Sequence, residues 1–175
     1  SLFPASWIQA QLRPSQQTAV DDVEKRTKEL KEINKSIWNF AEVGLQETRS
    51  SELLVEKLKS NGFKVKTGIS GMPTAFVASY GKGKPVIGIL AEYDALPGIG
   101  NAVVPERAPR EDGHKHGHGC GHNLFGAGSV GAAIAMKRGG AGDAAATLSP
   151  DNSSSIGILL GSRSGSIGRI QSPVG

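Results

Sequence analysis

PVIGILAEYD, at residues 85–94, is the stretch of sequence that decides the fold. Its nearly continuous apolar run is typical of a central strand that is covered on both faces. In open α/β sheets, binding sites collect at the carboxyl ends of such strands. Glu92 and Asp94 lie at that end, on the same face by strand alternation. They are therefore candidate site residues, although a carboxylate at a strand end can also be a solvated loop residue or a helix cap.

Helices and strands come before this stretch. Apolar residues recur at threes and fours over residues 15–41, which predicts one amphipathic helix, and a second helix is predicted over 49–60. Strands are predicted at 63–68 and 74–80, followed by a turn at the GKGK of 81–84. The expected fold class is α/β.

EDGHKHGHGCGH, at residues 111–122, contains all four histidines and the only cysteine of the chain. Imidazole and thiolate bind metals such as zinc, and Cys120 and His122 can place two donors on one ion from a short turn. The spacing matches none of the standard four-ligand patterns, so further ligands must come from elsewhere. The alternative is a solvated His-rich loop that holds no ion.

The sequence on both sides of this loop supports a fixed site. Residues 101–112 are interrupted by prolines and predict an extended loop around a rim, whereas 123–138 are rich in glycine and alanine and predict a tightly packed helix. A loop that leads into a buried helix is held by its scaffold, which fixes its donors better than a free tail would.

Composition excludes several classes of function. The chain has 175 residues, of which 38% are hydrophobic and only 5% aromatic, which is enough for a core over part of its length. Its formal charge is +4, but Lys and Arg are scattered among Asp and Glu, so nucleic-acid binding is not expected. No run approaches the roughly 20 apolar residues that span a bilayer, so no membrane partner is expected either.

The two ends of the sequence differ from the middle. Residues 1–14 resemble the tail of a secretory signal peptide or, equally, a disordered terminus, so the expected location is periplasmic or secreted in the first case and cytoplasmic in the second. A single cysteine excludes an internal disulfide. In residues 139–175, Gly and Ser contribute 16 of 37 residues, and apart from the apolar run at 156–160 we expect no regular structure.

Three motifs in order carry a family resemblance. They are FAEVGLQETRSSELLVEKLKSNGFKV at 40–65, ILAEYDALPG at 89–98 and HGHGCGHNLFGAGSVGAAIA at 116–135. Over residues 15–138 the chain resembles the N-terminal half of the binuclear-metal amidohydrolases and peptidases, in the branch typified by the aminobenzoyl-glutamate utilisation proteins.

The resemblance implies a three-layer α/β/α zinc-peptidase-like catalytic domain, truncated here and without the lid or dimerisation domain that is normally inserted downstream. It also implies hydrolysis of an amide between an acyl or aryl-acyl group and an amino acid, as in folate catabolism. The implied partners are a small N-acyl amino acid substrate and further chains of a homo- or hetero-oligomer.

The resemblance assigns roles to individual residues. It implies that Cys120 and His122 are metal ligands and that Asp94 orients a ligand. Glu92 stands where other branches carry a histidine, and His118 fills the first position of the His-x-Cys-Gly-His motif, so both are additional candidates. The implied cofactors are two divalent ions, zinc or manganese, and a thiolate favours zinc.

The family's general base belongs to a Glu-Glu pair beyond the matched region, and residues 139–175 stand where that region should begin. This suggests a frameshift or truncation, and we expect the chain to be inactive by itself, since general-base catalysis contributes about 10²–10⁴-fold. The alternative function is a non-catalytic metal-binding module. That module would use five donors, namely His114, His116, His118, Cys120 and His122.

Overall fold

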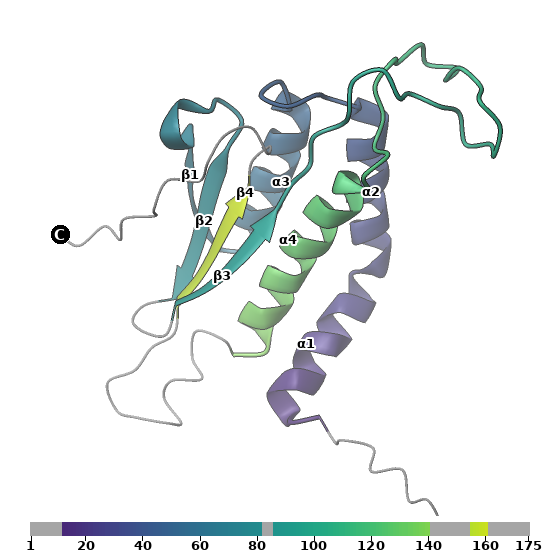
Figure 1. Cartoon of the computed structure of the whole chain (residues 1–175). Coiled ribbons are helices and arrows are strands. Elements are labelled where there is room, and N and C mark those ends of the chain that lie inside the picture. The colour runs from purple at the N-terminus through teal and green to yellow at the C-terminus, as the bar shows by residue number, and fades with distance from the viewer. Residues whose placement is uncertain (1–11, 82–85, 141–154, 161–175) are drawn as a thin grey trace, which may run out of the picture.

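The computed structural model describes residues 12–81, 86–140 and 155–160 (Figure 1). The elements in chain order are α1 (Pro14–Lys25), α2 (Thr27–Phe40), α3 (Thr48–Ser60), β1 (Lys64–Thr67), the 3₁₀ turn η1 (Ile69–Gly71), β2 (Phe76–Gly81), β3 (Val86–Ala91), α4 (His122–Arg138) and β4 (Ser155–Leu160). Helices α3 and α4 pack directly against the strands, while α1 and α2 lie along α4 (Figure 1). The predicted α/β class is confirmed. Within the described ranges, no helix is long and apolar enough to cross a membrane.

The prediction of a single helix over residues 15–41 is wrong. Helix α1 ends at Lys25 and α2 begins at Thr27, with Arg26 between them. The backbone of Arg26 has φ −90° and ψ 1°, well away from the helical ψ of about −42°. Its guanidinium donates to Asp22 and Glu29, both at 2.9 Å, and to the Asn61 side chain at 3.0 Å. The residue therefore joins three helices at the break.

The four strands form one sheet in the order β1-β2-β4-β3. The β1–β2 and β2–β4 pairs are antiparallel, and β3–β4 is parallel. The apolar run at 156–160, which was excepted from the expectation of no regular structure after residue 139, forms strand β4 and pairs on both sides, with Ala78 of β2 and Ile89 of β3 opposite Ile158. The rest of residues 141–175 lies outside the described residues. The GKGK turn at 81–84 lies largely outside the described residues.

Strand β3 is not covered on both faces, which corrects the expectation from its apolar sequence. In the described sheet β3 is an edge strand, and the four helices lie on one side of the sheet (Figure 1). Ala91 is buried and Ile89 packs against the core, whereas Leu90, on the opposite face, is 48% exposed. The covering layer that a continuous apolar strand requires is not among the described residues.

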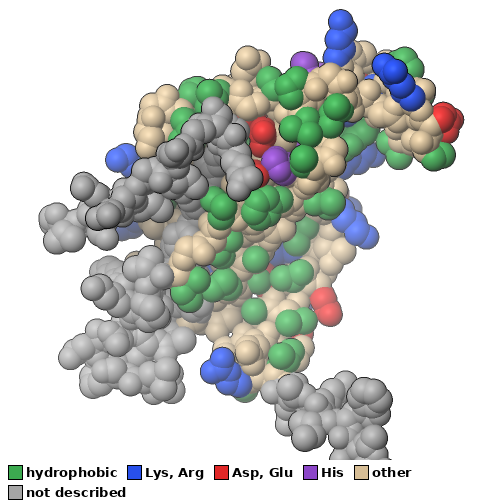
Figure 2. All heavy atoms as spheres, in the orientation of Figure 1, with side chains coloured by type: hydrophobic (Ala, Val, Ile, Leu, Met, Phe, Trp, Pro, Cys, Tyr) green, Lys and Arg blue, Asp and Glu red, His purple; other side chains and the backbone are tan. Residues whose placement is uncertain are grey.

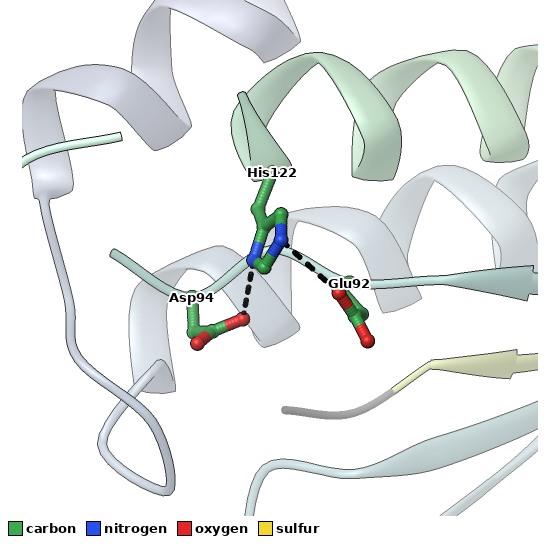
Figure 3. Close-up of side chains that lie close together, drawn as sticks. All are labelled: Glu92, Asp94 and His122. Carbon is green, nitrogen blue, oxygen red and sulfur yellow. Dashed lines mark hydrogen bonds and ion pairs between the residues drawn. The ribbon is translucent and has the colours of Figure 1, made fainter. Parts of the chain in front are cut away.

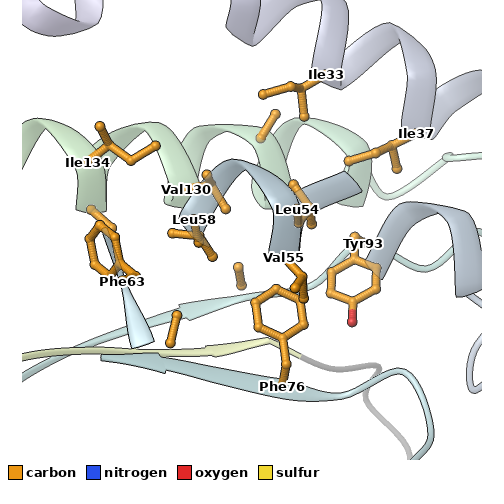
Figure 4. Packing of buried hydrophobic residues seen from close by; sticks show 14 residues of the cluster. Ile33, Ile37, Leu54, Val55, Leu58, Phe63, Phe76, Tyr93, Val130 and Ile134 are labelled. Carbon is orange, nitrogen blue, oxygen red and sulfur yellow. The ribbon is translucent and has the colours of Figure 1, made fainter. Parts of the chain in front are cut away.

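The core lies between the sheet and the helices (Figure 4). Its buried members come from α2, α3, α4 and the strands, and they include Ile37, Leu54, Leu58, Phe76, Tyr93, Val130 and Ile134. Small residues let α4 approach the end of β3 closely. At Gly126, for example, a Cβ would lie only 3.1 Å from the Glu92 carbonyl oxygen and 3.1 Å from the Tyr93 Cβ. This contact places the start of α4 directly over the end of β3.

Two backbone contacts fix the chain beyond β3. Ala95 donates to the Glu42 carbonyl at 2.7 Å, which joins this segment to the loop between α2 and α3. Leu96 and Gly117 exchange hydrogen bonds of 2.9 and 3.1 Å, which tie the histidine-rich loop to the same segment. The end of β3 is therefore the point where three distant parts of the sequence meet.

Candidate metal centre

Two carboxylates follow directly after β3. The side chains of Glu92 and Asp94 are 13% and 14% exposed, so both are largely withdrawn from water. Tyr93, between them, is fully buried in the core. Alternation along the extended chain thus sends the two carboxylates to one side and the ring to the other, as the sequence predicted.

The histidine partner of these carboxylates begins α4. Gly121 precedes it with φ 75° and ψ 23°, a left-handed conformation that suits glycine, and its N–H donates to the His118 carbonyl at 3.0 Å. This turn lets the chain enter α4 with His122 over the strand end. The His122 side chain is only 18% exposed.

His122 lies between the two carboxylates (Figure 3). Its Nδ1 is 2.8 Å from Asp94 Oδ1, and its Nε2 is 3.1 Å from Glu92 Oε2. A neutral imidazole carries a single N–H, so it can donate to only one of these carboxylates. If Nδ1 donates to Asp94, the Nε2 lone pair faces an oxygen of Glu92, and a cation between them satisfies both.

The donor set therefore fits a divalent metal. One donor atom from each of Glu92, Asp94 and His122 lies within 4.8 Å of the others, the one such group of three in the part of the chain that the structure describes. Carboxylate and imidazole are ligands for zinc and manganese. A carboxylate on the second ring nitrogen of a metal-bound histidine is a common arrangement that fixes the ring.

The other predicted residues stand outside this group. Cys120 is exposed and does not belong to the group of three, and its role as a ligand stays a prediction. His118 Nε2 lies 3.0 Å from the Ile37 carbonyl oxygen, so this nitrogen is the donor. Burial lowers the pKa of the His118 ring, which favours its neutral form.

The first two histidines of the loop also lie apart from the group of three. His114 is exposed, and the half-buried His116 accepts a long 3.4 Å contact at Nδ1 from the Gly98 backbone. The His-rich stretch thus does not act as one cluster, and His122 alone among its histidines meets the two carboxylates.

The sequence analysis missed a buried polar network behind the site. Its members are Glu47, Ser51, Thr74 and Tyr93, all of them buried. The Tyr93 hydroxyl donates to the Thr74 carbonyl at 2.5 Å, and the Thr74 hydroxyl donates to Glu47 Oε2 at 2.6 Å. The sequence did contain a signal for this network. Strand alternation places Tyr93 on the core side, opposite to Glu92 and Asp94, and a buried phenol needs a hydrogen-bond acceptor.

Comparison with known proteins places this geometry in a family. No family model matches the chain. Over 118 residues, 67% of the chain, it is 40% identical to one of the subunits of p-aminobenzoyl-glutamate hydrolase from Escherichia coli (strain K12). The chain belongs to the binuclear-metal amidohydrolase and peptidase family. The resemblance inferred from the three sequence motifs is confirmed.

Other family members agree with this assignment. The chain is 31% identical over 131 residues, 70% of its length, to thermostable carboxypeptidase 1 of Saccharolobus solfataricus. Its fold is similar to that of a dinuclear metal-binding peptidase of the M20 family from Bacillus subtilis, with a TM-score of 0.59 and 20% identity over 78% of the chain. The match covers 24% of the E. coli protein, 30% of the carboxypeptidase and 35% of the B. subtilis chain.

Proposed function

We propose that this chain forms the N-terminal metal-binding part of a metal-dependent amidohydrolase. The observation that carries the proposal is the position of His122 between Glu92 and Asp94, with donor atoms within 4.8 Å of one another at the carboxyl end of a strand. An ordinary surface ion pair would not need a carboxylate at each of the two ring nitrogens of a largely buried histidine.

Each of the three residues has a separate role in this proposal. Asp94 accepts from Nδ1 of His122 and so fixes both the tautomer and the ring orientation. His122 Nε2 and the Glu92 carboxylate then face the same position and would hold one divalent ion. Bound there, such an ion would lower the pKa of a water and polarise an amide carbonyl.

The proposed cofactors are two divalent ions, zinc or manganese. The described donors suffice for part of one ion's shell, so the second ion needs further ligands. We assign Cys120 to that second position, because it is exposed and lies two residues from His122 in sequence. A thiolate at this position favours zinc over manganese.

The proposed substrate is an N-acyl amino acid of the aminobenzoyl-glutamate type, cleaved at its amide bond. The name of the E. coli relative at 40% identity supports this choice, and its description as one subunit of a hydrolase supports assembly into an oligomer. By itself the chain is proposed to be inactive, because a binuclear site needs more donors than the single group of three that the described residues hold. A non-catalytic module built from all the loop donors is not favoured, since His114 and His116 lie outside the group.

The test is an activity assay with zinc or manganese against aminobenzoyl-glutamate and other N-acyl amino acids. The 175-residue chain is compared with a version extended by the C-terminal part of a relative. We expect the extended version to hydrolyse the amide and to lose activity on His122→Ala, whereas the chain alone binds metal without turnover. If the extended version binds metal but cleaves none of these amides, the amidohydrolase proposal is wrong.

A further inference from the structure

The buried polar network extends the site into the core. Glu47 and Ser51 come from the start of α3, Thr74 precedes β2, and Tyr93 follows β3. Ser51 and Tyr93 both donate to the Thr74 carbonyl oxygen, at 2.8 and 2.5 Å. Three separate segments of the chain therefore meet at one carbonyl group.

The position of Tyr93 makes this network relevant to the metal centre. Tyr93 is bonded through its backbone to Glu92 and Asp94, so a displacement of its Cα moves both carboxylates. Its ring is held on its face by Phe76, with ring centroids 6.1 Å apart, and at its hydroxyl by Thr74.

The loop between α2 and α3 holds the segment on the other side of Asp94. Ala95 donates to the Glu42 carbonyl at 2.7 Å. The Glu42 side chain accepts from the backbone N–H groups of Arg49 and Ser50 at the start of α3, at 3.0 and 2.9 Å. Ala95, after Asp94, is thus attached directly to the region between α2 and α3, whereas Tyr93, before it, reaches Glu47 of that region through Thr74.

Glu47 is costly for the fold, which argues that it does more than fill space. The side chain has no exposure to water, and its Oε1 has no hydrogen-bond partner among the described residues. A buried polar atom without a hydrogen-bond partner destabilises the folded state. An apolar residue would fill this position at lower cost, unless an oxygen that accepts from the Thr74 hydroxyl is needed.

We propose that Glu47 is a positioning residue for the metal centre, acting through Thr74 and Tyr93 on the Glu92 and Asp94 carboxylates. The inference rests on the proposed function, in which the Glu92 carboxylate binds the metal ion and the Asp94 carboxylate orients the His122 ring. Glu47 itself touches neither the ion nor the substrate. Its contribution is to hold the spacing of the two carboxylates, which an extended chain would otherwise leave free to shift.

The test uses Co²⁺ as the probe and the full chain as the protein. The Co²⁺ dissociation constant and the d–d absorption band, which reports coordination geometry, are measured for wild type, Tyr93→Phe, Glu47→Leu and Glu47→Gln. We expect Tyr93→Phe and Glu47→Leu to weaken binding by about tenfold, the lower end of the range for residues behind metal ligands, and to shift the band. Glu47→Gln keeps an acceptor for Thr74 and should restore most of the affinity.

A matched control separates positioning from stability. Ser129 of α4 donates to the carbonyl of Leu90 in β3 at 3.1 Å, and neither residue belongs to the buried polar network. Ser129→Ala should lower the Tm while leaving the Co²⁺ affinity and band unchanged. If Tyr93→Phe and Glu47→Leu lower only the Tm, as Ser129→Ala does, the positioning role is wrong and the proposed metal site stands. If wild type binds no Co²⁺, the proposed function fails together with this inference.

Discussion

His122 and His116 belong to one short stretch of sequence, but the fold treats them differently. His122 begins a helix, is largely buried and contacts carboxylates through both ring nitrogens. His116 lies in a loop and has one 3.4 Å contact with a backbone N–H. The difference teaches that the element which carries a histidine, rather than its place in a His-rich motif, decides whether its ring meets the carboxylates at the end of β3.

The cause of this difference is packing. Gly126 of α4 lies close to Glu92 and Tyr93, and an added Cβ would be only 3.1 Å from the Glu92 carbonyl oxygen and from the Tyr93 Cβ, so the lack of a side chain lets the start of the helix lie close to the strand end. His114 and His116 are held by backbone contacts such as Gly100 N to Lys115 O at 2.8 Å, which fix the loop but not the rings. Preorganised donors bind metal better than donors that must be ordered first.

The largest expected effect is the loss of His122. His122→Ala removes the donor that joins Glu92 and Asp94, and we expect Zn²⁺ affinity to fall by more than about 100-fold, beyond the range for residues behind the ligands. The measurement is isothermal titration calorimetry of the purified chain. The matched variant His116→Ala should leave the affinity unchanged. Equal losses in the two variants would mean that the loop, and not the helix start, supplies the metal site.

A smaller effect is expected at Asp94. Asp94→Ala leaves His122 in place but removes the acceptor on Nδ1, which should weaken Zn²⁺ binding by about 10–100-fold. Asp94→Asn should lose less, because its amide oxygen can still accept from the ring. The same titration measures both variants. An Asp94→Ala protein with wild-type affinity would show that the ring of His122 is fixed by α4 alone.

Cys120→Ala should cause a smaller loss than either variant. The thiol is exposed and outside the group of three donors, so we expect less than about a tenfold decrease in Zn²⁺ affinity, below the range for Asp94→Ala. The ratio of zinc to protein should fall in the same titration, because the second ion loses its proposed ligand. If affinity instead falls as far as in His122→Ala, then Cys120 is a ligand of the first ion.

The smallest expected effect, a small change in Tm, concerns Asp112 in the histidine-rich loop that also carries His116. Arg110 donates to Asp112 at 2.9 Å and stacks on the Trp38 ring, 3.7 Å from its centroid. The Arg110 guanidinium holds the pKa of the Asp112 carboxyl well below its usual range. The stability that this ion pair provides is therefore complete above a pH of about 3.9, the pKa in the unfolded chain, and is lost as the pH falls through the lowered pKa of the folded protein.

Asp112→Asn should therefore lower the Tm by roughly 1 °C near neutral pH, as expected for an ion pair whose carboxylate is exposed, and by less as the solution becomes strongly acid. Thermal unfolding of both proteins across pH measures this difference. Glu111→Gln, an exposed neighbouring change, is the control and should show no such dependence. Zn²⁺ affinity should not change in either variant, because this part of the loop does not hold the metal.

Local patterns predicted the elements well. The second helix, the first three strands and the long helix after the histidine loop all occur near the predicted positions. Strand alternation also predicted that Glu92 and Asp94 share a face, and the resemblance singled out His122, which the structure brings between them. These features depend on residues close in sequence, for which periodicity and turn chemistry are sufficient.

Features that depend on long-range contacts were not predictable in the same way. The break at Arg26 depends on its bond to the Asn61 side chain, and the pairing of β4 depends on strands from the first half of the chain. Glu47 was also missed, because nothing near it in sequence announces that its carboxylate is buried against Thr74. Tertiary contacts override local patterns in each case.

The place of β4 in the sheet has a consequence for the order of folding. Strand β2 ends at Gly81 and β3 begins at Val86, so a local hairpin between them is the pairing that forms fastest. In the native sheet, however, β4 lies between these two strands. A β2–β3 hairpin formed early must therefore open before β4 can enter, and refolding should contain a slow step that depends on the 155–160 segment.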